Sequence, residues 1–193
     1  MIATSFYNYK PVTGQQVIAN YTILNDQPFG SIYQHDVKLN DAYNILTKDI
    51  IFITPEAQDS IGNDPVGIKN IWVSCNYLNI QFYYRGYNKC HFINLVKDES
   101  EEYNDNKIHL EFRHNAYNDD ETYRHSGFVS FNLNSLFAQS REVTEKVNLV
   151  IHVKKLDGKE ITREYTYDPK SNEKNLLELD CDDYDEGKRG DFK

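Results

Sequence analysis

Cysteine and long apolar segments are scarce in this chain, and each scarcity excludes a class of protein. Three of the 193 residues are cysteine, namely Cys75, Cys90 and Cys181. An odd number of cysteines without metal-ligand spacing indicates neither a disulfide framework nor a zinc site. Cys75 and Cys90 lie in strand-like runs, where we expect them to be buried as small apolar residues, and Cys181 lies among carboxylates that should blunt its reactivity. We therefore predict no metal centre and no cofactor.

The longest apolar runs are far shorter than the ~20 residues that a membrane-spanning helix needs. Residues 1–11 also lack the basic start and the apolar stretch of a secretory signal. The sequence therefore predicts no membrane span and, from this start site, no export.

Positive charge is in deficit as well. The chain has 21 lysines and arginines against 30 aspartates and glutamates, a formal net charge of −9. Proteins that bind nucleic acid gain most of their affinity from basic side chains that displace phosphate counterions. We expect neither nucleic acid nor an anionic membrane surface as a partner.

Aromatic residues are abundant, with 15 tyrosines and 10 phenylalanines, and such residues favour strands. In the C-terminal part, apolar and polar residues alternate in short segments separated by turns, as expected for half-buried strands. The seven predicted strands cover residues 71–75, 78–84, 90–96, 108–114, 128–133, 147–154 and 160–167. Seven strands at this spacing are typical of an antiparallel, immunoglobulin-like β-sandwich.

The N-terminal part has fewer predicted strands and a predicted short helix. Residues 16–24 alternate as one strand, and residues 45–53 hold further strand-like material. Thr54 and Pro55 then offer an N-cap and a first helical position, which predict a short helix over residues 55–60. We place a domain boundary after this helix. The predicted organisation is a first domain at 1–64, a sandwich at 65–170 and an acidic, weakly apolar, mobile tail at 171–193.

Six blocks of sequence carry a family resemblance. They are GQQVIANYTIL at 14–24, VKLND at 37–41, LTKD at 46–49, DSIGNDP at 59–65, HFINLV at 91–96 and HLEFRHNA at 109–116. In this order they resemble the NigD-like family, over about residues 9–169. The resemblance implies an N-terminal OB-like domain followed by a β-sandwich, in exported bacterial lipoproteins of the outer membrane or periplasm. It also implies a role in bacteriocin immunity and brings no catalytic residues.

The chain departs from the family at its start. It begins inside the OB-like domain and leaves three or four strands where an OB-fold needs five. The resemblance therefore implies an incomplete OB-like domain, and we expect a longer form with a lipid anchor and an extracytoplasmic location. The open sheet edges of an incomplete barrel could support a homodimer.

The densest polar constellation contains His114, Asn118, Asp119, Asp120 and His125. Carboxylates and amides can hold a hard cation, and two histidines can bind zinc. The spacing matches no known metal signature. A solvated loop whose Asn and Asp residues form turns is the alternative that we favour.

Four tyrosines, Tyr77, Tyr83, Tyr84 and Tyr87, gather around one predicted hairpin. Tyrosine is a common binding anchor, so this group is a candidate surface for a glycan or a protein. The alternative is that some of the rings fill the core and the others cover it.

No catalytic fingerprint is present. Cys90 and His91 are adjacent, but neighbours on a strand point to opposite faces and cannot form a catalytic pair. We predict a non-enzymatic binding or accessory protein of the cell envelope, with bacteriocin immunity as the candidate role. The alternative is a surface carbohydrate-binding module that uses the tyrosine-rich hairpin.

Overall fold

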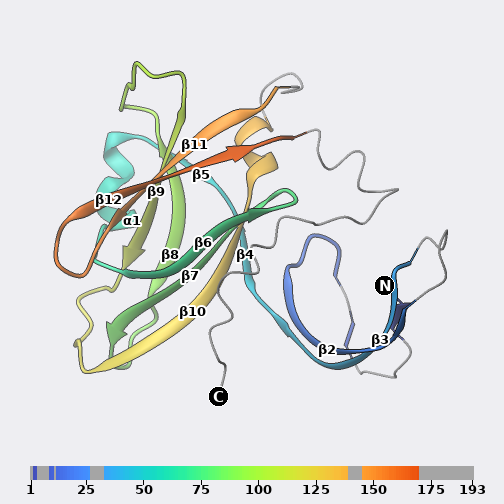
Figure 1. Ribbon diagram of the computed structural model, residues 1–193. Helices are drawn as coiled ribbons and strands as arrows, with labels where there is room; N and C mark the ends of the chain where they lie inside the picture. The colour runs from blue at the N-terminus through green and yellow to red at the C-terminus, as the bar shows by residue number, and fades with distance from the viewer. Residues whose placement is uncertain (1, 4–8, 11, 27–32, 139–144, 170–193) are drawn as a thin grey trace.

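The computed structural model describes residues 2–3, 9–10, 12–26, 33–138 and 145–169. These residues form three β-sheets with little helix, which confirms the predicted mainly β class (Figure 1). The predicted tail at 171–193 lies outside the described residues. No helix in the described ranges is long and apolar enough to cross a membrane.

The N-terminal sheet has three strands in the order β1-β3-β2. Strand β1 (Ile2–Ala3) runs parallel to β3 (His35–Asn44), and β2 (Val17–Asp26) pairs with β3 antiparallel with two register shifts. Every residue of β2 is exposed. Within the described part of the chain, these strands do not close a barrel.

The remaining strands form the sandwich. One sheet has the order β4-β10-β7-β6 and the other β12-β11-β9-β8-β5. The strands are β4 (Leu46–Asp49), β5 (Ile51–Ile53), β6 (Gly67–Ser74), β7 (Tyr77–Gly86), β8 (Phe92–Asp98), β9 (Ile108–Asn115), β10 (Tyr123–Asn132), β11 (Val147–Lys154) and β12 (Glu160–Tyr167). Strands β6 to β12 are the seven that the alternation predicts.

Three of the pairings in the sandwich are parallel. Strand β4 runs parallel to β10, β5 to β8, and β9 to β11. The sandwich therefore contains parallel as well as antiparallel pairs, whereas the sequence predicts an antiparallel sandwich. Strands β4 and β5 also precede the predicted boundary at residue 64, yet each pairs with a sandwich strand. Ile50 lies between them and is buried, because the chain crosses there from one sheet to the other.

The core lies between the two sheets of the sandwich. Its largest fully buried side chains include Phe112, Phe131 and Tyr167, with leucine, isoleucine and valine from both sheets around them. These residues come from the inward phase of the alternating strands. The sandwich therefore has one continuous apolar interior.

The predicted helix at 55–60 is present as a 3₁₀ turn, η1 (Pro55–Ala57), followed by α1 (Gln58–Ile61). Gly62, with φ of 74°, ends it. A second 3₁₀ helix, η2 (Leu133–Phe137), begins where Asn132 accepts a hydrogen bond from the N–H of Asn134. It occupies a region that the sequence assigns only to a loop or a single turn.

The prediction that Cys75 and Cys90 are buried is wrong, since both are exposed. Cys75 lies in the tight turn between β6 and β7 with φ of 51°, and Cys90 lies in the connection between β7 and β8. The alternating pattern does not show where a strand stops and its turn begins, so residues at strand ends are easily misassigned.

Candidate functional site

The four predicted tyrosines do not share one surface. Tyr83 and Tyr84 are neighbours on β7, so their rings lie on opposite faces of the sheet. The Tyr84 ring packs beside the sandwich core, whereas Tyr77 begins the strand and donates a 3.1 Å hydrogen bond to the carbonyl of Gly14. Tyr87 lies beyond the other end of β7 and is 52% exposed.

Tyr87 belongs to a different group of aromatic residues. Its ring stacks on that of Tyr123, with centroids 5.9 Å apart, and the ring of Phe92 meets that of Tyr117 edge-on at 5.5 Å. All four side chains are exposed. We call them the aromatic end, because the loops after β7 and β9 bring them to the same end of the sandwich.

Two members of the predicted polar loop, His114 and Asp119, are joined through His91. Nδ1 of His91 lies 2.8 Å from Nε2 of His114, and Nε2 of His91 lies 3.1 Å from Oδ2 of Asp119. The side chains of His91 and Asp119 are each only 2% exposed. Tyr84 covers both imidazoles, with ring centroids at 4.5 and 5.4 Å.

The other members of the predicted polar loop do not contact the linked side chains of His91, His114 and Asp119 through their own side-chain hydrogen bonds. Asp120 is exposed, and the ring of His125 stacks on that of Tyr84 with centroids 5.3 Å apart. Asn118 contributes its backbone, since its carbonyl and that of Tyr117 accept hydrogen bonds from Lys89 Nζ at 2.8 and 2.9 Å. The backbones of Tyr117 and Asn118 are left-handed, with φ of 49° and 53°.

Hydrogen bonds and burial set the charge states of His114 and Asp119, the two side chains that His91 links. Burial would raise the pKa of Asp119, but hydrogen bonds from the Tyr87 N–H, from His91 and from the Asn88 N–H outweigh it and hold that pKa well below its ordinary value. Burial lowers the pKa of His114. Asp119 is therefore an anion that fastens the loop after β9 to the loop after β7.

The polar atoms of His91 and His114 contact groups of the protein itself, namely one another, Asp119 and the Pro65 carbonyl. No nucleophile lies beside either imidazole in the contacts that the structure shows. Across the described ranges, no three histidine, cysteine, aspartate or glutamate side chains converge in a way that could hold a metal ion. The arrangement shown is a structural lock for the aromatic end.

A second histidine pair is absent from the candidates drawn from the sequence. Nδ1 of His109 on β9 lies 2.9 Å from Nε2 of His152 on β11. Asp105 flanks the first imidazole at 3.1 Å and Glu160 the second at 2.7 Å, while Tyr103 stacks on His109 at 3.5 Å. Alternation predicts the face on which each histidine lies, but it does not predict that β9 and β11 are neighbours.

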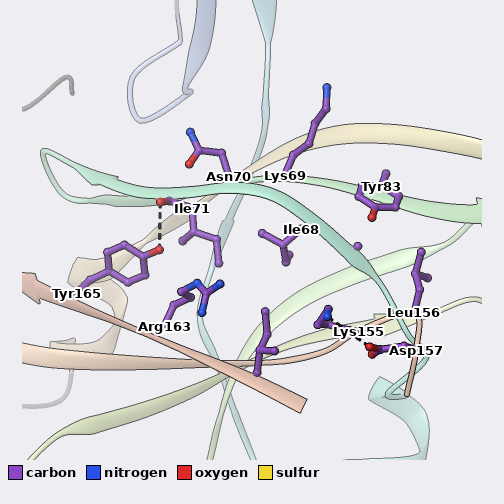
Figure 2. Close-up of a pocket in the computed structure, with 12 residues that line it drawn as sticks. Ile68, Lys69, Asn70, Ile71, Tyr83, Lys155, Leu156, Asp157, Arg163 and Tyr165 are labelled. Atoms are coloured by element: carbon purple, nitrogen blue, oxygen red, sulfur yellow. Dashed lines mark hydrogen bonds and ion pairs between the residues drawn. The ribbon is translucent and has the colours of Figure 1, made fainter. Parts of the chain in front are cut away.

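A cleft lies elsewhere, between the edge strands β6 and β12 of the two sheets (Figure 2). Its volume is about 510 Å³, within the range of ligand sites in proteins. The residues that line it are Gly67, Ile68, Lys69, Asn70, Ile71, Tyr83, Lys155, Leu156, Asp157, Ile161, Arg163 and Tyr165. No histidine or cysteine is among them.

Hydrogen bonds close the cleft at both ends. At one end the N–H of Val66 donates to the carbonyl of Lys154 at 2.9 Å. At the other the Tyr165 hydroxyl donates to the carbonyl of Ile71 at 3.1 Å (Figure 2). Between these bridges the two sheet edges separate and leave the opening.

The charged groups of the cleft are mostly basic. Arg163 projects from β12 toward β6, and Lys155 lies 3.4 Å from Asp157 in the hairpin turn (Figure 2). Lys69, also on β6, points away from the cleft on the opposite side of the strand (Figure 2). In a chain with a net charge of −9, this is a local excess of positive charge.

A known protein family matches more than half of the chain. The family described as NigD-like C-terminal beta sandwich domain matches residues 49–167. No curated protein sequence matches the chain.

Solved structures give similar matches. A candidate toxin-related protein from Parabacteroides distasonis is 34% identical, with a TM-score of 0.70 over 88% of this chain and 81% of that chain. A protein of unknown function from Bacteroides vulgatus is 30% identical, with a TM-score of 0.66 over 79% and 71%. A NigD-like immunity protein from Bacteroides caccae shares the fold at 22% identity, with a TM-score of 0.60 over 83% and 80%.

Proposed function

We propose, on the premise that this chain belongs to the NigD-like family, that it is a non-enzymatic binding protein of the bacterial cell envelope. In this proposal it acts in bacteriocin immunity by holding a protein partner. The family supplies the immunity role, and a protein of the same fold bears the name of a NigD-like immunity protein.

The cleft between β6 and β12 is the observation that carries the binding role. Its volume of about 510 Å³ is that of a ligand site, and it lies between two sheet edges rather than beside the buried histidines. Exposed strand edges offer backbone donors and acceptors to an added strand, a common way to bind a protein segment. Its lining is suited to recognition, because it combines such edges with basic and tyrosine side chains.

An envelope location is part of the proposal. It follows from the family resemblance, which implies exported lipoproteins. Fractionation of the host cells, with an antibody against the chain, would test it directly. Recovery of the protein in the cytosolic fraction alone would contradict the envelope location.

Deletion of the gene tests the immunity role. We expect the deletion strain to become sensitive to bacteriocin preparations from related producer strains that leave the parent unharmed. Wild-type chain should restore resistance, Arg163→Glu should not, and Lys38→Glu, the same change of charge at an exposed position of β3, should. Equal sensitivity of parent and deletion strain to every preparation would refute immunity.

Carbohydrate binding is a second candidate function, favoured by the aromatic end. Two pairs of exposed rings are held there by the lock around Asp119, and exposed aromatic residues on a fixed backbone suit a binding surface. Saturable binding on a glycan array that Tyr87→Ala and Tyr123→Ala abolish, and that Tyr77→Ala retains, would favour this function. An array without signal would exclude it for the glycans displayed.

A further inference from the structure

Arg163 occupies a position where the fold calls for an apolar side chain. It lies on β12 between Ile161 and Tyr165, and side chains two residues apart on a strand share a face. Both neighbours are partly buried and pack against the core. The arginine therefore interrupts the inward face of an edge strand, and such a local conflict is expected where function requires it.

No carboxylate compensates this arginine. Its guanidinium donates to the carbonyl of Thr162 at 3.1 Å, and no ion pair joins it to an acidic side chain within the described residues. The other basic residue inside the cleft, Lys155, has Asp157 beside it. Arg163 is thus the cation best placed to receive an acidic group from outside, with up to two parallel hydrogen bonds to one carboxylate.

The backbone of β6 faces the same opening. Because the Ile71 carbonyl accepts a hydrogen bond from Tyr165 across the cleft, it points away from β7. In an antiparallel pair, the N–H and C=O of one residue point to the same side, so the Ile71 N–H also faces the cleft. The edge from Gly67 to Ile71, which has a register shift between Ile68 and Asn70, spans ~13 Å at ~3.3 Å per residue, enough for a strand of about four residues.

We infer that the cleft between β6 and β12 binds an extended, acidic segment of a protein partner, whose backbone lies along β6 and whose carboxylate pairs with Arg163. The inference rests on the proposed function in taking the partner to be a protein. The net charge of −9 repels an acidic segment at long range. Binding therefore depends on the local contact and weakens as salt screens it.

NMR titration of the full chain with short peptides tests the inference. The probe is an eight-residue peptide of alternating valine and glutamate. A peptide with lysine for glutamate tests charge, and one with proline at two valine positions tests strand pairing, since proline cannot donate to a ladder. We expect only the first to shift the amide signals of β6 and β12.

Variants locate the contact. Arg163→Gln should weaken the acidic peptide about tenfold, in line with the loss of a charge-assisted pair, while Arg85→Gln, on the exposed face of β7, should not. Melting curves check that both variants fold. If Arg163→Gln is unstable, Lys155→Gln is the substitute, with a weaker effect expected because Asp157 shares its charge.

Other outcomes would overturn the inference. Equal binding of the acidic and lysine peptides, or of Arg163→Gln and wild type, would remove the role of charge. Competition by free glutamate as effective as the peptide would reduce the site to a small-anion site. Binding seen only in a chain ending at residue 169 would make the acidic segment 171–193 of this chain the occupant, instead of a partner.

The two proposals fail separately. If the acidic peptide binds as described but the deletion strain stays resistant, the binding site is supported and the immunity role is refuted. If immunity depends on Arg163 but no acidic peptide binds, the immunity role is supported and the acidic nature of the partner segment is refuted.

Discussion

The ring of Tyr83 lies where a side chain on Gly67 would have to be. The two residues are paired between β6 and β7, and a β-carbon on Gly67 would come within 2.1 Å of Cζ of Tyr83. The guanidinium of Arg124 covers the ring at 3.8 Å. The absence of a side chain at Gly67 thus fixes the tyrosine that borders the cleft.

Gly67→Ala should therefore destabilise the protein. The added methyl group forces the Tyr83 ring out of its place, and overpacking of this kind costs about 1–3 kcal/mol. Urea unfolding measures the change. In a Tyr83→Ala background, Gly67→Ala should cost much less unfolding free energy than it does in the wild type. If its cost is the same in both backgrounds, the contact is contradicted.

Asp119→Asn should loosen the aromatic end. The amide keeps the shape of the carboxylate but loses its charge and one of its acceptors for the Tyr87 N–H, the Asn88 N–H and His91. We expect faster hydrogen exchange at Tyr87 and Asn88, by about tenfold or more, with a lower melting temperature. Asp120→Asn is the matched control, and an equal effect of both substitutions would argue against the lock.

Stability should fall as the pH drops through the ordinary pKa of histidine. Burial lowers the pKa of His114 below 6.5, with His91 acting in the same direction and the Pro65 carbonyl and Asp64 opposing it. Near pH 6.5 the unfolded chain takes up a proton that the folded chain does not, so the unfolded state is favoured as the pH falls. This contribution is fully present above the unfolded pKa.

The slope of unfolding free energy against pH between 5 and 8 is the measurement. His114→Gln should flatten this slope whatever it does to absolute stability, because the variant has no imidazole to titrate there. A slope that His114→Gln does not alter would contradict the assignment.

Tyr167→Phe should cost about 0.5–1.5 kcal/mol of stability, the net contribution of an ordinary hydrogen bond, because it removes the hydroxyl that contacts two asparagine side chains. The hydroxyl lies 2.8 Å from Oδ1 of Asn76 and 2.9 Å from Oδ1 of Asn134. Burial, with the charge of Asp168 nearby, raises the pKa of Tyr167 to about 12. Thermal unfolding would measure the loss, and the exposed Tyr123→Phe should show almost none.

The same tyrosine makes a prediction at high pH. The folded chain keeps the proton of Tyr167 where the unfolded chain, with a pKa near 10.0, has lost it. Stability should therefore decline as the pH rises above 10.0. The decline should be smaller in Tyr167→Phe, and an unchanged decline would show that other groups cause it.

The alternation of side chains was sufficient to predict the strands of the sandwich and their inner faces. Thr54 and Pro55 likewise predicted the short helix. The same alternation put Arg163 on the inward phase of its strand, so this signal was present in the sequence although it was not among the candidate sites. The partnership of His109 with His152 had no such signal, because it requires β9 and β11 to be neighbours.

The sequence by itself therefore determined which segments become strands and which side chains face inward, since both depend on the local two-residue period. Only the tertiary structure decided which strands pair, that β4 and β5 join the sandwich, and that the edges of β6 and β12 separate to form a basic cleft. These features depend on contacts between residues far apart in the chain, and such contacts are selected by the packing of the whole core and not by any local pattern.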